Sequence, residues 1–102
     1  MKESAFQAKI RTALRSRGCK VYKMQQNATT SYATPDLLFL YGPKYGFLEC
    51  KRKKPTPSDF QPGQEARVAY FDKMSFARVI YPENFDEVIA DIERFIDGNK
   101  SR

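Results

Sequence analysis

The amino-acid sequence predicts one α/β domain, and three observations lead to that class. The chain has 102 residues, which is long enough for one compact core and too short for two. Hydrophobic residues make up 41% of it, as expected of a folded globule rather than a disordered tail. Segments with helical and strand-like spacing follow one another in the order αβββαβα, which is typical of an α/β layer architecture. Any function must therefore be carried by a single domain.

The N-terminal part is expected to contain one helix, one strand and a loop. Apolar residues such as Phe6 and Ile10 recur at helical spacing over residues 3–17, and Gly18 supplies a natural stop. Residues 21–24 have the composition of a short strand. Residues 25–34 are polar and show no periodicity, so they are expected to form a loop.

The middle of the chain predicts a β-hairpin. Two strand-like runs, residues 35–41 and residues 45–52, are separated by the turn signal Gly42-Pro43-Lys44. Both runs are too continuously apolar for an exposed edge of a sheet. The hairpin is therefore expected to supply the central strands.

A basic, proline-containing segment at residues 51–57 ends the hairpin and leads to a second helix. Ser58 with Gln61 has the spacing of a capping box, and the apolar pattern that follows runs to about Met74.

The C-terminal part predicts a strand and a last helix. Residues 77–81 form the strand, which Pro82 stops. Asn84 with Glu87 has the spacing of a second capping box, and the helix that it opens carries one apolar stripe before Gly98.

Composition excludes several kinds of catalytic site. The chain has no histidine and two cysteines, so a histidine-based zinc site, a Ser-His-Asp triad and a histidine general base are ruled out. Cys19 and Cys50 lack CxxC spacing, and we expect free core thiols in a reducing compartment. The absence of a long apolar run and of a signal-peptide pattern predicts a cytosolic protein. Catalysis must then use carboxylates, lysine and hard metal ions.

Charge is distributed unevenly along the chain. Residues 1–54 contain twelve Lys and Arg against three acids, a net charge of +9, whereas residues 55–102 contain six against nine, a net charge of −3. The basic half predicts a surface for a polyanion, with nucleic acid ahead of an anionic membrane. On charge alone, an ordinary solvated surface is equally well supported. The three acids of the basic half, Glu3, Asp36 and Glu49, are all site candidates.

The principal candidate site combines Pro35-Asp36 on one strand of the hairpin with Glu49-Cys50-Lys51 on the other. Side chains alternate across a strand, so Glu49 and Lys51 share a face while Cys50 points away. An even loop, with two residues at Pro43-Lys44 or four at residues 42–45, would place Asp36 opposite Lys51 and Leu38 opposite Glu49 on that same face. A three-residue loop would turn Asp36 to the wrong face.

Two carboxylates on one face suit a hard divalent cation such as Mg²⁺ or Mn²⁺, which takes oxygen ligands. Asp36 and Glu49 are the predicted ligands, with the backbone carbonyl of Cys50 as a further oxygen. Such a metal polarises a phosphate and activates water without any histidine, and Lys51 would hold the water or neutralise charge in the transition state. The alternative is a cross-strand ion pair between Asp36 and Lys51, with Glu49 paired to another base.

Glu3 is a third candidate ligand. It lies three residues before Phe6, on the apolar side of the predicted first helix, where a carboxylate is unusual. The alternative is that this first-turn acid only complements the helix dipole.

These residues resemble the PD-(D/E)XK nuclease superfamily, whose fold many restriction enzymes and Holliday-junction resolvases share. Within it they are most similar to the VRR-NUC group, the virus-type replication-repair nucleases. The matching segments are residues 35–38, residues 47–52 and the helix that begins near Gln64. The resemblance implies a restriction-endonuclease-like αβββαβ core, a central mixed sheet flanked by helices, and an extra C-terminal helix. Two features depart from the pattern: Thr34 replaces a small glycine, and the hairpin turn is long.

The resemblance also implies residue roles. Asp36 and Glu49 would be metal ligands, Lys51 the catalytic lysine, and Glu3 the first-helix acid that helps to hold metal or water. Gln64 matches the glutamine that opens the helix after the ExK motif, although an ordinary polar residue at a helix start is an equal alternative.

Our first hypothesis is a Mg²⁺- or Mn²⁺-dependent DNA endonuclease of a bacterial or phage-infected cytoplasm. Phosphate contacts carry affinity but little sequence information, which favours selectivity for branched, junction or flap DNA in replication, repair or recombination. The resemblance implies a homodimer in which each subunit cuts one strand. The predicted DNA-backbone contacts are Lys20, Lys23, Lys44, Arg52, Lys53 and Lys54. The alternatives are a catalytically silent nucleic-acid-binding module on the same fold and a small basic ribonucleoprotein component.

Overall fold

The computed structural model describes residues 2–24, 35–60 and 62–98. Its elements confirm the predicted order, and their ends lie within three residues of the predicted ranges except at the second helix, which begins after Gly63 rather than Ser58. The helices and strands are α1 (Glu3–Arg15), β1 (Lys20–Lys23), β2 (Leu37–Tyr41), β3 (Lys44–Cys50), α2 (Gln64–Met74), β4 (Ala77–Ile80) and α3 (Phe85–Ile96), with two short 3₁₀ turns, η1 (Pro57–Asp59) and η2 (Pro82–Asn84). The loop predicted for residues 25–34 lies outside the described residues.

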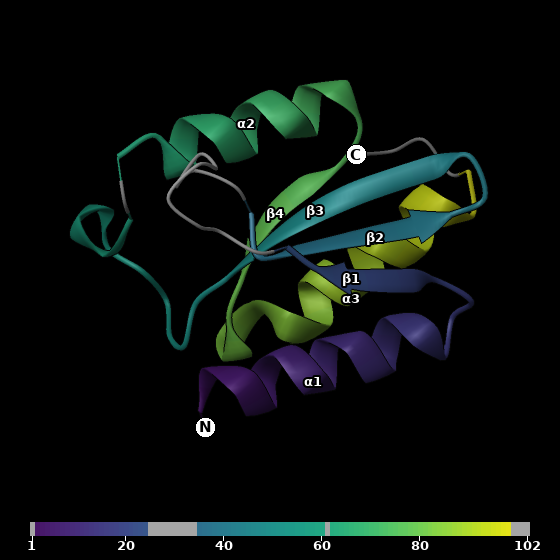
Figure 1. Ribbon diagram of the computed structural model, residues 1–102, viewed down its shortest axis with the longest axis horizontal. Coiled ribbons are helices and arrows are strands. Elements are labelled where there is room, and N and C mark those ends of the chain that lie inside the picture. Colours follow the sequence, from purple (N-terminus) through teal and green to yellow (C-terminus); the bar gives the residue numbers. More distant parts are fainter. Residues whose placement is uncertain (1, 25–34, 61, 99–102) are drawn as a thin grey trace.

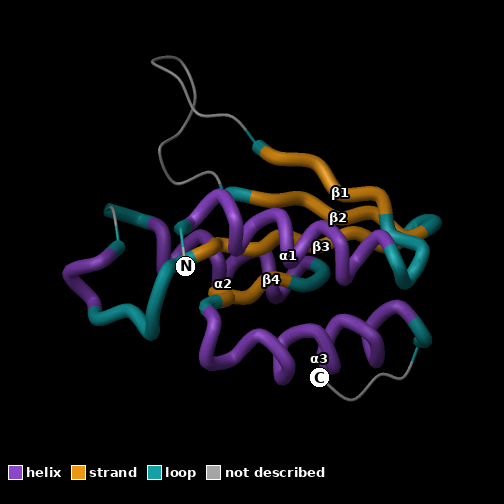
Figure 2. The backbone as a smooth tube through the Cα atoms, turned by 90° about the horizontal axis from the view of Figure 1, so that it is seen from below, coloured by secondary structure: helices purple, strands orange, loops and turns teal. Residues whose placement is uncertain are grey.

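The four strands form one mixed sheet in the order β1-β2-β3-β4. The first three are antiparallel neighbours, and β4 runs parallel to β3. The hairpin strands β2 and β3 are therefore central, as predicted, and Figure 2 shows β1 at one edge and β4 at the other. Figure 1 shows α2 on one face of the sheet and α1 and α3 on the opposite face.

The main core lies between the sheet and the α1/α3 layer. Leu37, Phe39 and Leu48 point from the central strands into this layer and are fully buried. They meet side chains of α1 and α3 that are equally inaccessible, among them Phe6, Ile10, Leu14 and Ile92. Burying one such side chain contributes about 1.5–3 kcal/mol. Cys19 and Cys50 are free and buried in this core, as predicted.

The hairpin register differs from the predicted one by two residues. Tyr41 pairs with Lys44, so the loop is Gly42-Pro43, and Leu38 stands opposite Phe47 rather than Glu49. Gly42 has a φ of 58°, which a glycine adopts without strain, and Pro43 has no N–H to contribute to the ladder. Both residues are therefore better placed in the loop than in a strand.

The hairpin loop nevertheless has an even number of residues, as predicted. Continued by one pair beyond Leu37 and Leu48, the register places Asp36 opposite Glu49 instead of Lys51. Because side chains alternate with a period of two, a shift of two residues leaves every side chain on its predicted face. Asp36, Glu49 and Lys51 consequently share the α2 side of the sheet, whereas Leu48 and Cys50 point into the main core.

The first capping-box prediction is wrong. The box that forms is Thr56 with Asp59, at the 3₁₀ turn η1, and Gln61 lies outside the described residues. The helix α2 begins after Gly63, whose φ is 85°.

The second capping box is wrong as well. Asn84 does occupy the N-cap position of α3, but its side chain makes no cap hydrogen bond. Its Oδ1 accepts from the Tyr81 N–H at 2.8 Å, and its Nδ2 donates to the Val79 carbonyl at 3.0 Å. The backbone groups at the outer edge of β4 thus compete successfully for this side chain.

Gly46 should be intolerant of substitution, because the Phe39 ring lies across it. A Cβ added at Gly46 would stand 2.4 Å from the Phe39 ring. We expect Gly46→Ala to lower the free energy of unfolding by about 1–3 kcal/mol through overpacking, measured by urea denaturation. Gly42→Asn is the control, since no atom lies within 4 Å of its added Cβ and asparagine tolerates a positive φ. A larger loss for the Gly42 variant would contradict this packing.

Candidate active site

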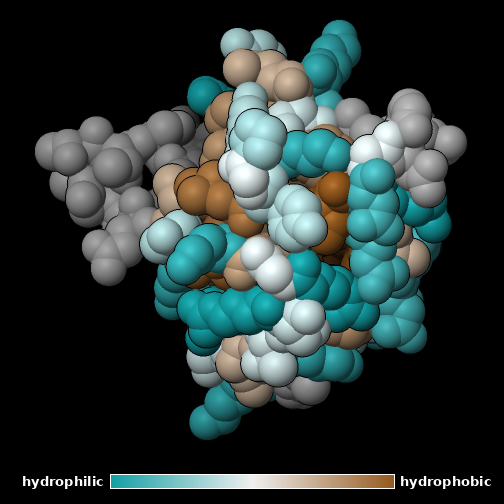
Figure 3. Space-filling model, turned by 90° about the vertical axis from the view of Figure 1, so that its right-hand side faces the viewer, coloured by the Kyte–Doolittle hydropathy of each residue, from teal (hydrophilic) through white to brown (hydrophobic). Residues whose placement is uncertain are grey.

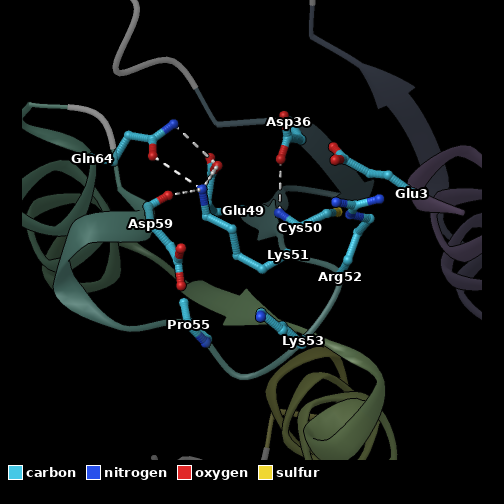
Figure 4. Close-up of a pocket in the computed structure, with 10 residues that line it drawn as sticks. All are labelled: Glu3, Asp36, Glu49, Cys50, Lys51, Arg52, Lys53, Pro55, Asp59 and Gln64. Carbon is cyan, nitrogen blue, oxygen red and sulfur yellow. Dashed lines mark hydrogen bonds and ion pairs between the residues drawn. The ribbon is translucent and has the colours of Figure 1, made fainter. Parts of the chain in front are cut away.

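A pocket of about 370 Å³ opens at the end of the sheet where β2 begins and β3 ends. All five residues to which the sequence assigned catalytic roles line it: Glu3, Asp36, Glu49, Lys51 and Gln64. They come from four different parts of the fold, and Figure 4 shows their side chains converging on one space. Arg52 and Lys53 complete the basic side of the pocket.

Glu49 lies at the inner wall of the pocket and is 3% exposed. Its Oε2 accepts a hydrogen bond from Nε2 of Gln64 at 3.1 Å and lies 3.5 Å from Nζ of Lys51. Gln64 is 5% exposed, and its Oε1 accepts from the same Lys51 ammonium at 3.3 Å. The side-chain amide of Gln64 therefore bridges Glu49 and Lys51, and all three side chains are fixed by one another.

Lys51 is held over the pocket by groups beyond this bridge. Its Nζ donates to the backbone carbonyl of Asp59 at 2.9 Å and lies 4.9 Å from the centre of the Phe60 ring. The side chain is only 18% exposed. A lysine held in this way keeps its ammonium group directed at the space in front of Glu49.

Asp36 is fixed by the backbone of β3. The Cys50 N–H donates to Oδ2 of Asp36 at 2.8 Å. On its other side, the carbonyl of Asp36 accepts from the Met24 N–H at 2.7 Å, which extends the β1–β2 ladder by one residue. Asp36 is thus held through its carboxylate by Cys50 and through its backbone carbonyl by Met24.

Pro35 affects the hydrogen bonding of the Cys50 backbone carbonyl. Because the backbone groups of Asp36 face β1, those of Pro35 face β3, and the register places Pro35 opposite Cys50. A proline has no N–H, so the ladder bond that the Cys50 carbonyl would accept from Pro35 cannot form. On this register the Cys50 carbonyl faces the strand that leads to Asp36, and its role as a metal ligand stays a prediction.

Glu3 approaches the same space from the start of α1. Figure 4 shows its carboxylate directed toward Asp36, and its Oε2 accepts from Nε2 of Gln7 at 3.4 Å. Gln7 is buried. Glu3 itself is exposed, so it borders the pocket rather than forming its inner wall.

The two central carboxyl groups have raised pKa values. Burial raises the pKa of Asp36, against the lowering effects of the Cys50 N–H and the Lys51 charge. Burial and the neighbouring Asp36 carboxylate raise the pKa of Glu49 to about 7, and Lys51 opposes them. Two neighbouring carboxyl groups that are shielded from water and cannot both ionise freely form a centre of negative potential. Such a pair is a favourable place for a cation.

The donor set fits a hard divalent cation. Asp36, Glu49 and the Cys50 carbonyl supply oxygen only, which suits Mg²⁺ or Mn²⁺ and not a soft metal. Within residues 2–24, 35–60 and 62–98, no group of three or more His, Cys, Asp or Glu side chains is arranged to hold a metal ion. A cation here would therefore depend on Asp36, Glu49 and backbone or water oxygens more than on a third side chain.

The predicted basic residues fall into two groups. Arg52 and Lys53 line the pocket, Lys54 follows them and is exposed, and Lys23 lies close enough to lower the pKa of Asp36. Lys20 lies at the far end of β1, opposite Leu40.

Lys44 has a structural partner instead. Its Nζ donates to the carbonyls of Phe95 and Ile96 at 2.8 and 3.2 Å, at the C-terminal end of α3, where a cation also complements the helix dipole. It sits in the hairpin, at the end of the sheet away from the pocket. Figure 3 views this end and shows some hydrophobic atoms visible between mostly hydrophilic side chains.

Comparison with known proteins identifies the fold. A scan against protein-family models finds no match, and no curated protein sequence matches. Among solved structures, the Holliday junction resolvase Hjc of the archaeal hyperthermophile Archaeoglobus fulgidus matches with a TM-score of 0.55 and 16% identity, over 78% of this chain and 69% of that chain. The chain shares the fold of a Holliday junction resolvase. This confirms the predicted α/β class, with a mixed sheet flanked by helices. None of the helices in the described part of the chain is long and apolar enough to cross a membrane.

Three contributors to the pocket were not foreseen in the sequence. The Asp59 carbonyl and the Phe60 ring both hold Lys51, and Gln7 supports Glu3. The position of Gln7, four residues after Glu3 on one helix face, is a signal that could have been used. The contribution of the segment around Asp59 depends on the path of the chain after β3, for which the sequence offers no periodic signal.

The raised pKa of Glu49 predicts a pH-dependent stability in the metal-free protein. The folded chain retains the proton up to about pH 7, while an unfolded glutamate loses it near pH 4.3. The stabilisation is complete below the unfolded pKa and is lost as pH rises through about 7, by on the order of 1–3 kcal/mol. Chemical denaturation in EDTA between pH 4.5 and pH 8.5 measures this loss.

Glu49→Gln is the matched variant, because it keeps the shape of the side chain and cannot ionise. Its stability should change less with pH than that of the wild type, and above pH 7 it should be the more stable of the two. Parallel pH profiles for the two proteins would contradict the assignment of the raised pKa to Glu49.

Proposed function

We propose that this chain is a Mg²⁺- or Mn²⁺-dependent DNA endonuclease of the PD-(D/E)XK superfamily. One observation carries the proposal. The half-buried carboxylate of Asp36 and the buried carboxylate of Glu49 lie with the Lys51 ammonium in one pocket. The pocket has a basic rim and lies on a fold that a Holliday junction resolvase shares. Assignment to the VRR-NUC group is a finer part of the proposal and rests on the matching motifs and Gln64.

The metal would be held by Asp36, Glu49 and the Cys50 carbonyl, and Glu3 would help to hold the metal or a water molecule. When bound, it supplies Lewis acidity toward a phosphodiester oxygen and lowers the pKa of a water molecule. Asp36 and Glu49 place this chemistry on one face of the sheet, at the start of β2 and near the end of β3. Their raised pKa values mean that the doubly ionised pair is unfavourable on its own. A bound cation would neutralise part of this negative charge.

Lys51 and Gln64 would act on the reacting groups. The Lys51 ammonium faces the space in front of Glu49, where it can donate to the attacking water or to a phosphate oxygen as negative charge develops. Gln64 acts as a positioning residue, because it hydrogen-bonds Glu49 and accepts from Lys51. A group fixed before the substrate arrives avoids reorganisation during the reaction.

The substrate would be DNA that is branched or otherwise departs from a plain duplex. Arg52, Lys53 and Lys54 follow the ExK motif and would contact phosphates, which positions the substrate without reading its bases. Lys23 would add a contact on the other side of Asp36. We further propose an intracellular role in replication, repair or recombination, carried out by a homodimer in which each subunit cuts one strand.

A cleavage panel tests the activity. Single-stranded, duplex, flap and four-way-junction DNA are incubated with the protein in Mg²⁺, in Mn²⁺ and in EDTA. We expect metal-dependent cleavage that Asp36→Ala and Lys51→Ala each lower by at least about a hundredfold, because each removes a group acting on the transition state. Lys73→Ala is the control for Lys51→Ala, since Lys73 is exposed on α2 and does not line the pocket. Cleavage that all variants retain equally would point to a contaminating nuclease.

A catalytically silent nucleic-acid-binding module is the second candidate function. It is favoured by the observation that, in the part of the chain that the structure describes, fewer than three acidic, Cys or His side chains gather at any one potential metal position. It predicts that the wild type leaves every DNA substrate intact in Mn²⁺ and binds DNA as tightly after Glu49→Ala as before. The same panel, combined with a binding assay, therefore separates the two functions.

A further inference from the structure

The free edge of the sheet at β1 carries an exposed aromatic side chain. Tyr22 is 51% exposed. It stands opposite Leu38, so its ring is on the face of the sheet that carries Asp36 and Glu49. On that face α2 packs near β3, where the Phe47 and Phe71 rings stack with centroids 4.5 Å apart. The β1 side of the same face is left accessible at Tyr22.

Tyr22 is a close neighbour of the candidate active site. Asp36 pairs with Met24 through the 2.7 Å bond that extends the β1–β2 ladder, and Tyr22 lies two residues before Met24 on the same face. Diagonal neighbours of this kind on an antiparallel pair are about 7–8 Å apart. This distance is close to the spacing between adjacent nucleotides in a stretched single strand. A base stacked on Tyr22 would therefore be that of the nucleotide at the cleaved phosphate or of the next nucleotide.

The surroundings of Tyr22 are basic. Lys20 and Lys23 flank it on β1, and both are exposed. Beside it, a hollow is lined by Arg15 and residues 18–22, and no acidic residue of the described chain lines it. The sequence contains no Asp or Glu between Glu3 and Asp36. Cations beside an aromatic ring can contact phosphates while the ring stacks on a base.

The two edges of the sheet differ in a way that favours nucleic acid over another β-strand. At β4, the Asp72 side chain accepts from the Ala77 N–H and the Asn84 side chain donates to the Val79 carbonyl, so polar side chains cover that edge. At β1, lysines stand at the edge, and pairing two copies of β1 would bring Lys20 and Lys23 of both chains together. Like charges directly across a strand pair are unfavourable. The charge complements a polyanion instead.

We propose that Tyr22 is a base-stacking residue for an unpaired nucleotide next to the scissile phosphate, with Lys20 and Lys23 on the flanking phosphates. A base within an intact duplex is stacked on its neighbours and has no face free for Tyr22. Stacking on Tyr22 therefore selects DNA with an unpaired nucleotide at the cleavage point, such as a flap or a branch. This inference rests on the proposed nuclease function for the position of the scissile phosphate.

The test measures DNA binding in EDTA, so that it does not depend on cleavage. Fluorescence anisotropy gives the Kd of the full chain for a flap substrate and for a blunt duplex of the same length. We expect Tyr22→Ala to raise the Kd for the flap by about five- to a hundredfold and to change the Kd for the duplex less than about twofold. Tyr22→Phe keeps the ring and should bind both as the wild type does.

Tyr41→Ala is the matched control. Tyr41 is 38% exposed on the neighbouring strand, at the hairpin end and on the other face, so its removal should leave both Kd values unchanged. Flap and duplex binding weakened equally by Tyr22→Ala would overturn the proposal, as would no effect. The proposal would also be overturned if Tyr22→Ala converts a dimer to a monomer in light scattering and keeps its affinity for the flap. The Tyr22 ring would then contact a second copy of the chain.

Failure of this inference is distinguishable from failure of the proposed function. If Asp36→Ala abolishes metal-dependent cleavage while Tyr22→Ala leaves the substrate preference unchanged, the nuclease function is retained and the stacking role of Tyr22 is rejected. Selective loss of flap binding in Tyr22→Ala, in a protein that cleaves nothing in Mn²⁺, would support the stacking residue and reject the nuclease.

Discussion

The approach of two carboxylates, the half-buried Asp36 and the buried Glu49, is the interaction on which the rest of the site depends. It follows from the hairpin register, which places the two residues opposite each other on the α2 side of the sheet. Each carboxylate is then held by a different partner: Asp36 by the Cys50 N–H and Glu49 by Gln64. A slip of one residue would send Asp36 to the core face. The turn at Gly42-Pro43 therefore determines which side chains come together at the opposite end of the strands.

This arrangement lowers the stability of the fold in return for a preorganised site. Burial opposes the ionisation of both carboxyl groups, and their mutual repulsion adds to it at Glu49. Lys51 offsets part of that repulsion, and the hydrophobic core on the other face supplies the stabilisation that the site lacks. Strained electrostatics of this kind are characteristic of functional sites. The α1/α3 face thus holds the main core, while the α2 face carries the candidate active site.

Much of this site was predictable from sequence because it depends on local periodicity. Continuous apolar runs identified the central hairpin, and strand alternation placed Asp36, Glu49 and Lys51 on one face. The exact register was not predictable, since the pattern permits loops at two positions and only the backbone of Gly42-Pro43 selects one. The contacts of Lys44 and Asn84 were missed for another reason. Each side chain bonds backbone groups of a neighbouring element, which local propensity does not reveal.

Mn²⁺ binding by the isolated protein tests the central claim most directly, since it probes the carboxylate pair without any DNA. Titration followed by electron paramagnetic resonance of free Mn²⁺ should show a site in the wild type whose affinity Asp36→Asn and Glu49→Gln each weaken by at least about tenfold. Lys44→Ala, at the far end of the sheet, should bind Mn²⁺ as the wild type does. Equal Mn²⁺ affinity in all four proteins would contradict the assignment of Asp36 and Glu49 as metal ligands.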